Sequence, residues 1–288
     1  YVDSASTDGS AEVAAEIFDR VLVLRRDSRL CASAGRFVGA SRARAPWVLH
    51  LDGDMKLVPA FVPALVEAVE GSVYPNNVVA ITGRYRDVYP GGAEREYAVG
   101  PYDAVLRSMV FGGAVLMRRQ AVLAAGNWNP RVQSNEELEL LVRMVEHDGR
   151  ATSVDCVMVE HHTPRPRRIR VLAGLFIPFP PQRARFGGFG QLVRAAVEQE
   201  RLGSLCRRLP LVLWLWIMLA LASVAALLGR PGLAGVSLVA GVSPVAVLKG
   251  VRYVAVYLGF LPQLVAGWSR YDGRFEPEVE REFVSGDR

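Results

Sequence analysis

An apolar run of strand length that ends in two carboxylates constrains the fold of this chain most. The run covers residues 47–51, and Asp52 and Asp54 follow it with one glycine between them. Because side chains alternate along an extended backbone, both aspartates can leave the strand end on the same side and share one cation. A divalent ion held there could bind a diphosphate. The alternative is a polar strand end that turns back into solvent.

Strand and helix patterns alternate around this run. The expected elements are a strand ending at residue 3, helices over 10–18, 33–44 and 59–69, and strands over 21–24, 78–82 and 152–159. Residues 84–102 are expected to form loops or short hairpins. The alternation predicts an α/β fold with a mostly parallel sheet that is covered on both faces. Ligands bind such sheets at the carboxyl ends of the strands, where Asp3 and Asp52 lie.

The C-terminal third is expected to lie in a membrane. Residues 209–228 are apolar and carry no charge, and their number is close to the roughly 20 residues that cross a bilayer. Two shorter apolar runs, 232–248 and 253–268, are broken by Pro244 and Pro262, and each could span the membrane or lie at its surface. We therefore predict two or three transmembrane helices within residues 209–268.

Basic residues are concentrated in front of this region. The chain has a formal net charge of +5, and much of the basic excess lies between Arg165 and Arg208. Arginines next to a membrane segment meet lipid headgroups, at about 1 kcal/mol each, and mark the cytoplasmic side. A membrane, and not nucleic acid, is therefore the expected partner. We expect residues 163–208 to form an interfacial segment with an amphipathic helix over 189–202, and residues 269–288 to form a charged tail.

The cysteines and the first residues bear on the compartment and on the start of the chain. Cys31, Cys156 and Cys206 are far apart and form no Cys-x-x-Cys pair, which fits a reducing compartment and argues against a zinc site. Residues 1–3 contain neither a start methionine nor a charged signal-peptide region. The sequence is therefore expected to be truncated at its N-terminus.

Four sequence blocks, taken in order, resemble a family 2 glycosyltransferase with the GT-A fold. The resemblance covers about residues 1–162, and the family's first strand and helix, which grip the nucleotide base, are missing here. One block would be weak evidence, whereas four in the right order are specific. The blocks are Val2-Asp3-Ser4-Ala5-Ser6-Thr7-Asp8-Gly9, Leu51-Asp52-Gly53-Asp54, Gly112-Gly113 with Gly126-Asn127-Trp128-Asn129-Pro130, and Glu136-Glu137.

The resemblance implies transfer of a sugar from a nucleoside diphosphate to an acceptor hydroxyl, with inversion at the anomeric carbon and with Mg²⁺ or Mn²⁺ at the leaving diphosphate. Asp54 is then the metal ligand, and Asp52 contacts the ribose or a metal-bound water. Asp3 matches the aspartate that binds the nucleotide base, although Ser4 replaces its usual acidic neighbour. Arg36 faces the nucleotide, in a motif where phenylalanine follows it in place of asparagine.

The acceptor hydroxyl must lose its proton as it attacks, which requires a carboxylate within hydrogen-bond reach. Glu136 and Glu137 occupy the position of the family's Glu-Asp pair, and Glu137, in place of the aspartate, is the expected base. Ordinary capping of a helix N-terminus explains the same pair without any function. Gly113 is expected to let the backbone approach the donor sugar. Trp128 either stacks on a sugar face or lies in the core.

Two further sites follow from the resemblance. Of the adjacent residues His161 and His162, at most one is expected to bind the metal or the diphosphate, because their side chains point opposite ways, and we favour His161. Residues 182–186 resemble the Gln-x-x-Arg-Trp motif of membrane-bound processive synthases, with phenylalanine in place of tryptophan. In that motif Arg185 would pair with the diphosphate, and Gln182 and Phe186 would lie at the acceptor.

Three other interpretations compete with this one. Haloacid-dehalogenase phosphatases also end a strand in Asp-x-Asp, but they need a lysine further along the soluble domain, and this chain has Lys56 and Lys249 alone. An EF-hand is disfavoured because Lys56 stands where a calcium ligand would be. The more serious alternative is a catalytically inactive membrane scaffold on a glycosyltransferase fold. The presence of four carboxylates at matching positions argues against it.

We therefore predict a membrane-anchored, inverting glycosyltransferase of the hexosyl-transferring type, with its catalytic domain at the cytoplasmic face of the inner cell membrane. The donor is a UDP- or GDP-sugar. The acceptor is a polyprenyl phosphate, a growing glycan, or a lipid or peptide-linked molecule. The residues do not decide among these acceptors or among sugars, because epimers differ only in the positions of hydroxyl groups.

Overall fold

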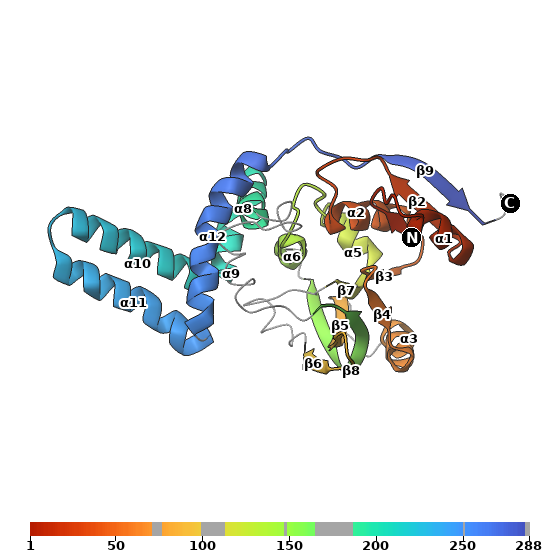
Figure 1. The fold of residues 1–288 in the computed structure, drawn as a ribbon, viewed down its shortest axis with the longest axis horizontal. Coiled ribbons are helices and arrows are strands. Elements are labelled where there is room, and N and C mark those ends of the chain that lie inside the picture. Colours follow the sequence, from red (N-terminus) through yellow and green to blue (C-terminus); the bar gives the residue numbers. More distant parts are fainter. Residues whose placement is uncertain (71–76, 99–112, 147–148, 165–186, 250, 286–288) are drawn as a thin grey trace. The chain divides into compact units, whose positions relative to one another are not determined.

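The computed structural model divides the chain into two compact units (Figure 1). The first unit contains residues 1–165 and 271–288, and the second contains residues 166–270. The structure describes all residues except 71–76, 99–112, 147–148, 165–186, 250 and 286–288.

Two sheets form the framework of the first unit. Strands β1 (Val2–Asp3), β2 (Arg20–Leu24) and β9 (Val279–Val284) make a three-stranded sheet in the order β1-β2-β9. A six-stranded sheet has the order β3-β7-β5-β8-β4, with β6 paired to β5. Its strands are β3 (Trp47–Leu51), β4 (Met55–Leu57), β5 (Val78–Val88), β6 (Glu94–Ala98), β7 (Ala114–Arg118) and β8 (Arg150–His162).

The helices of the first unit lie close to their predicted positions. They are α1 (Ser10–Ile17), α2 (Ala32–Arg42), α3 (Val62–Glu70) with a preceding 3-10 turn (Pro59–Phe61), α5 (Arg119–Ala124) and α6 (Glu136–Glu146). Strands β5 and β8 extend beyond the ranges expected for them, and β4 was not predicted. Residues 84–88 and 94–98 form a hairpin, as expected for that region.

Both sheets are mixed, so the prediction of a mostly parallel sheet is wrong. Strand β1 is parallel to β2, and β5 is parallel to β8, whereas the other described strand pairs are antiparallel. The reason lies in the connections. Strands β5 and β6 are joined by a short turn in which Gly91 and Gly92 have positive φ, and so short a connection joins antiparallel strands. Alternating patterns identify the elements, but they do not specify which strands pair.

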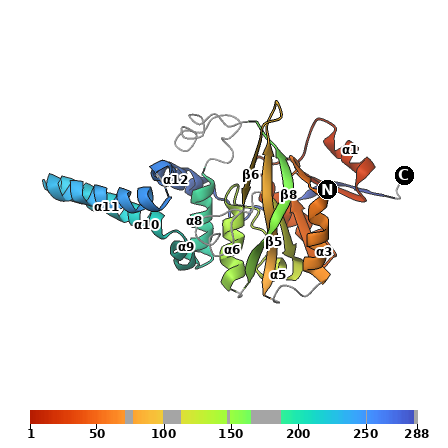
Figure 2. The same ribbon diagram turned by 90° about the horizontal axis from the view of Figure 1, so that it is seen from below.

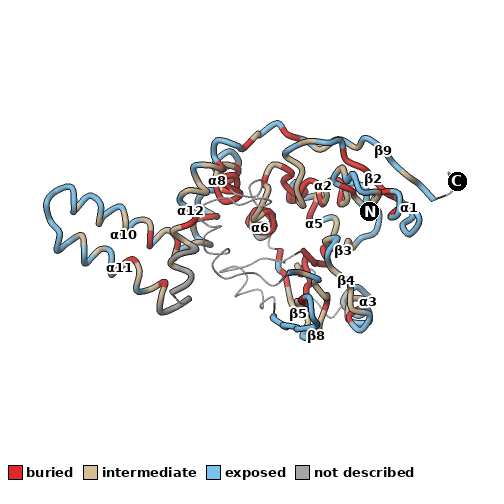
Figure 3. The backbone as a smooth tube through the Cα atoms, in the orientation of Figure 1, coloured by how far each residue is buried: buried red, intermediate tan, exposed pale blue. Residues whose placement is uncertain are grey.

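Helices cover both faces of the six-stranded sheet, with α6 on one side and α3 on the other (Figure 2). Strand β7 shows how side-chain alternation produces these layers. Val115 and Met117 pack with Leu140 of α6, whereas Leu116 packs on the opposite face with Leu65 of α3. Burying a side chain of this size contributes about 1.5–3 kcal/mol. The buried residues of the first unit lie along both sheets and the helices that cover them (Figure 3).

The C-terminal residues return to the first unit as an edge strand. Strand β9 pairs with β2 in antiparallel orientation (Figure 1). Phe275 is buried against Leu22 and Leu24 of β2, and Asp272 forms an ion pair with Arg29. The residues that the sequence suggests are a charged tail therefore include a strand of the first sheet.

The described part of the second unit is helical. Its helices are α8 (Gly188–Glu198), α9 (Leu202–Arg208), α10 (Pro210–Leu227), α11 (Pro231–Lys249) and α12 (Val251–Arg270). Helix α8 packs against α12, where the rings of Phe189 and Phe260 stack with centroids 4.3 Å apart. Part of the apolar face of the predicted amphipathic helix is therefore covered within this unit.

One described helix, α10, is long and apolar enough to cross a membrane, and residues 231–246 of α11 form a shorter apolar stretch. One such helix is weak evidence for a membrane protein, because length and composition are its only basis. The prediction of two or three transmembrane helices is therefore not established.

Candidate active site

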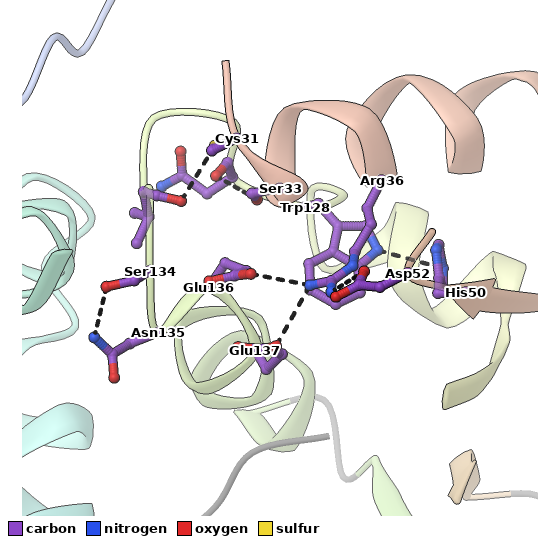
Figure 4. Close-up of polar contacts among 12 residues, drawn as sticks. Cys31, Ser33, Arg36, His50, Asp52, Trp128, Ser134, Asn135, Glu136 and Glu137 are labelled. Carbon is purple, nitrogen blue, oxygen red and sulfur yellow. Dashed lines mark hydrogen bonds and ion pairs between the residues drawn. The ribbon is translucent and has the colours of Figure 1, made fainter. Parts of the chain in front are cut away.

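A buried arginine joins the carboxylates that the sequence placed in separate motifs. Arg36 of α2 donates to Asp52 at 2.8 Å, to Glu136 at 3.0 Å and to Glu137 at 3.4 Å (Figure 4). The side chains of Arg36, Glu136 and Glu137 are buried, and that of Asp52 is partly exposed. We call these four residues and Trp128 the Arg36 cluster. It lies where the end of β3, helix α2 and the first turn of α6 meet.

Trp128 supports the arginine from the core. Its side chain is fully buried, and the guanidinium carbon of Arg36 lies 4.9 Å from its ring centroid, a cation–π arrangement. The indole Nε1 donates to Nε2 of His50 at 3.4 Å. Burial, and then the charge of Arg36, lowers the pKa of His50 to about 3, so this ring is neutral and accepts the bond. Of the two roles expected for Trp128, its burial fits the core residue.

The two glutamates differ from other acidic residues of the same helix. Glu136 and Glu137 begin α6 and face Arg36, whereas Glu139 pairs with Arg143 one turn later. Three carboxylates share one guanidinium in the Arg36 cluster, so negative charge is in excess. Burial, and then the neighbouring Glu136, raises the pKa of Glu137 to about 7, and Arg36 opposes this shift. Glu137 can therefore exchange a proton near neutral pH.

Gly113 shapes the position of Asp52. The backbone N–H of Asp52 donates to the Gly113 carbonyl at 2.9 Å, and Gly113 has a φ of +97°. A Cβ at this position would overlap the carboxylate of Asp52. From the sequence, this glycine was expected to let a donor sugar approach. In the structure, a side chain at this position would meet Asp52 and Met55, so glycine leaves room for the Asp52 carboxylate, and the approach of a donor sugar stays a prediction.

Asp3 lies at the end of β1 and is almost completely buried. Its Oδ2 accepts from the backbone N–H of Ser6 at 2.7 Å, whereas Oδ1 has no hydrogen-bond partner in the part of the chain that the structure describes. A buried carboxylate oxygen without a donor leaves a free acceptor for a ligand N–H or O–H.

Asp54 has partners different from those of Asp52. Its Oδ2 lies 3.3 Å from Nε2 of His161, and Nδ1 of His161 lies 2.9 Å from Oδ1 of Asp87. The side chain of Asp54 is 59% exposed and that of His161 is 22% exposed. We call these two residues the Asp54–His161 pair. The ring nitrogen Nε2 of His162 lies 4.0 Å from a carboxylate oxygen of Glu160. Among the described residues, no hydrogen bond or ion pair joins the His162 ring to Asp54 or His161.

The predicted site residues therefore fall into separate groups. The structure brings Arg36, Asp52, Glu136 and Glu137 together, and it brings Asp54 together with His161. Among the described contacts, none joins the side chains of Asp52 and Asp54, which the sequence predicted to share one cation. The remaining predicted residues, Gln182, Arg185 and Phe186, lie outside the described residues.

Two residues that contact these groups were not predicted from the sequence. His50 lies on β3, two positions before Asp52, which directly follows this strand, so the alternation of side chains could have placed both on the same side. Asp87 contacts His161 from a different strand, and no spacing in the sequence connects the two. The link depends on the pairing of β5 with β8.

The Asp54–His161 pair fits part of the coordination shell of a divalent cation. Ligands at about 2.1 Å in neighbouring octahedral positions are about 3 Å apart, close to the 3.3 Å between Oδ2 and Nε2. No group of three or more His, Cys, Asp or Glu side chains that could hold a metal occurs in the described ranges. A cation would therefore take its other ligands from phosphate oxygens and water, as Mg²⁺ commonly does.

The fold and these two groups of residues define an α/β protein in which charged side chains gather at strand and helix ends. Residues 1–122 match the family model described as "Glycosyl transferase family 2". This match supports a family 2 glycosyltransferase, the family that the sequence motifs indicated. A search of curated proteins returned no match.

Solved structures with similar backbones include GalNAc-T7 and TarS. GalNAc-T7 with UDP, GalNAc and Mn²⁺ aligns at 14% identity and a TM-score of 0.46, over 69% of this chain and 42% of that chain. Residues 1–349 of TarS from S. aureus align at 12% identity and a TM-score of 0.49, over 100% of this chain and 87% of that chain. The same TarS segment in complex with UDP aligns at 11% identity and a TM-score of 0.45. The chain spans less than half the length of GalNAc-T7.

Proposed function

We propose that this protein is a metal-dependent, inverting glycosyltransferase that transfers a hexosyl group from a nucleoside-diphosphate sugar to an acceptor hydroxyl or phosphate. The family of residues 1–122 supports sugar transfer. The observation that carries the proposal is Glu137, a buried carboxylate whose pKa is raised to about 7 and which shares Arg36 with Asp52. A general base works best with a pKa near the working pH.

In the proposed reaction, the acceptor oxygen forms a bond to the anomeric carbon while the bond from that carbon to the diphosphate breaks. Glu137 takes the proton that a hydroxyl acceptor loses, and Glu136 is the alternative base. A single displacement of this kind inverts the anomeric centre. Arg36 keeps Glu137 in place and offsets part of the negative charge around it.

The donor would be held by residues outside the Arg36 cluster as well as by Asp52. A divalent cation, when bound, would neutralise charge on the leaving diphosphate, and Asp54 and His161 would hold it. Asp3 is proposed to bind the nucleotide base, which is supported by its buried and unpartnered Oδ1, as far as the described residues go. UDP- and GDP-sugars are the proposed donors.

A membrane location is supported by α10. Only 11% of α10 is buried, whereas the core helix of a soluble protein would be mostly buried. We propose that α10 anchors the protein in the inner membrane with the catalytic domain on the cytoplasmic side, next to the basic residues that precede the helix. The acceptor would then be linked to lipid, as a polyprenyl phosphate or a growing glycan is.

The test is transfer by the full chain in membranes, with a panel of UDP- and GDP-sugars and with Mn²⁺ or a chelator. We expect metal-dependent release of the nucleotide. Glu137→Gln should lower kcat by about 10²- to 10⁴-fold and leave UDP binding unchanged. Glu67→Gln is the matched control, because it makes the same change at an exposed position of α3.

Other outcomes would change the assignment. A loss of turnover in Glu136→Gln, with activity retained in Glu137→Gln, would make Glu136 the base. A wild-type chain that turns over no sugar nucleotide in the panel, whether Mn²⁺ is present or not, would favour the inactive membrane scaffold.

A further inference from the structure

His161 lies between two carboxylates, so a hydrogen-bond acceptor faces each of its two ring nitrogens. Its Nδ1 is 2.9 Å from Oδ1 of Asp87, and its Nε2 is 3.3 Å from Oδ2 of Asp54. A neutral imidazole has one N–H group and so can donate to only one of them. The other ring nitrogen then turns a lone pair toward a carboxylate oxygen. A cation between that nitrogen and that oxygen would satisfy both.

The two carboxylates are not equivalent. The side chain of Asp87 is 14% exposed, whereas that of Asp54 is 59% exposed. The shorter and better shielded contact is the one with Asp87, so the ring proton is expected on Nδ1. The lone pair of Nε2 then faces Asp54 at the more exposed end, where a cation and its phosphate ligands could enter.

Asp87 is itself held in place by its surroundings. Asp87 and His161 are direct partners in the pairing of β5 with β8, so rigid strands determine their separation. The hydroxyl of Tyr97, on β6, donates to Oδ1 at 3.3 Å, and the hydroxyl of Tyr89 donates to Oδ2 at 3.2 Å. These two donors hold the Asp87 carboxylate in one orientation.

We propose that Asp87 is a positioning residue that holds the His161 ring with Nε2 directed at a divalent cation shared with Asp54. This inference rests on the proposed function, because a nucleotide-sugar transferase supplies the reason for a cation at this place. Carboxylates that orient a metal-bound histidine through its other ring nitrogen are common in metal sites, and removing them weakens the metal affinity.

The experiment measures Mn²⁺ binding to the full chain by electron paramagnetic resonance of free Mn²⁺, with and without UDP. Asp87→Asn should weaken Mn²⁺ binding by about 10- to 100-fold. Asp155→Asn is the matched control and should leave binding unchanged. Asp155 is also a carboxylate of this sheet, but its side chain is 95% exposed and it pairs with Arg84.

A double-mutant cycle shows whether Asp87 acts through His161. His161→Ala should weaken Mn²⁺ binding, and adding Asp87→Asn to His161→Ala should then have little further effect. An equal effect of Asp87→Asn with and without the histidine would overturn the proposal, as would unchanged binding in the single variant. A wild-type chain that binds no Mn²⁺, with or without UDP, would also overturn it.

Two further measurements keep the proposal separate from folding and from the transfer reaction. Thermal unfolding without metal identifies a variant that has lost its fold. Tyr97→Phe provides a milder variant, because it removes one hydroxyl that orients Asp87 and should weaken Mn²⁺ binding by about 2- to 10-fold. If the wild-type chain transfers no sugar but binds Mn²⁺ with this dependence on Asp87, the proposed function fails and the positioning role stands. Metal-independent transfer with no Mn²⁺ binding would keep the sugar-transfer activity but would overturn both its metal dependence and the positioning role of Asp87.

Discussion

The Arg36 cluster and the Asp54–His161 pair each contain a carboxylate that follows strand β3. The cluster is largely buried, whereas the pair is more exposed. The side chains of Arg36 and Glu137 are each 8% exposed, and the cluster shares its charges within the core. The side chain of Asp54 is 59% exposed, and its partner is the ring of His161, which is 22% exposed. Asp52 and Asp54 are separated by one residue, but they belong to these two different environments.

The comparison shows how two neighbouring aspartates can serve different chemistry. In the buried cluster, interactions between charges are strong and the pKa of a carboxylate is easily raised, which suits proton transfer. At the exposed pair, water and phosphate oxygens can reach a cation, which suits binding of a ligand that enters and leaves. A change in the buried cluster should therefore affect stability more than the same type of change in the exposed pair.

The largest effect is expected for Arg36→Met. Removing the guanidinium leaves three carboxylates without their shared counter-charge, and breaking a buried ion pair in this way costs about 3–5 kcal/mol. Urea unfolding of the full chain, without metal and in one detergent, measures the loss. A change below about 1 kcal/mol would show that water compensates these carboxylates, which would remove the contrast between the two environments.

A smaller effect with the opposite sign is expected for Glu137→Gln. The pKa of Glu137 is raised from 4.5 to about 7 in the folded protein, so this residue favours folding most below pH 4.5, and that contribution is lost as the pH rises through 7. Glutamine does not titrate. The variant should therefore be more stable than wild type at pH 8, by up to about 3 kcal/mol, and similar to it at pH 4.5. Equal stability at both pH values would contradict the raised pKa.

Gly113→Ala should lower the unfolding free energy by about 1–3 kcal/mol, because an alanine here is strained at positive φ and its Cβ overlaps Asp52. It should also raise the KM for the sugar nucleotide. Gly92→Ala is the control, since Gly92 also has positive φ but a Cβ there would have no described atom within 4 Å. The difference between the two variants measures the displacement of Asp52, and equal effects would show that backbone strain alone is responsible.

The smallest effect on stability is expected for Asp54→Asn. Exposed substitutions usually change the unfolding free energy by less than about 0.5 kcal/mol, and the same urea measurement without metal tests this. Mn²⁺ binding should nevertheless be weakened. A loss of stability comparable to that of Arg36→Met would mean that Asp54 has a structural role, and the two environments would then not differ as proposed.

Much of the local structure could be predicted from the sequence, and so could the family. The strand at 47–51 and the helix that begins at Glu136 occur where patterns of a few residues placed them, and the strand predicted over 152–159 lies within the longer β8. Residues 1–122 match the family that the Asp-x-Asp and neighbouring motifs indicated. The mixed sheet was not predictable in this way, because β4 has three residues and β6 follows a short turn.

The sequence by itself determined which residues carry charge at the ends of strands and helices, because propensity and side-chain alternation act over a few positions. Only the tertiary structure decided their partners. Arg36 and Glu137 are 101 positions apart, and Asp87 and His161 are 74 positions apart. Their contacts depend on how helices pack and on the register of β5 against β8. Register is set by the packing of whole layers, which no short sequence pattern specifies.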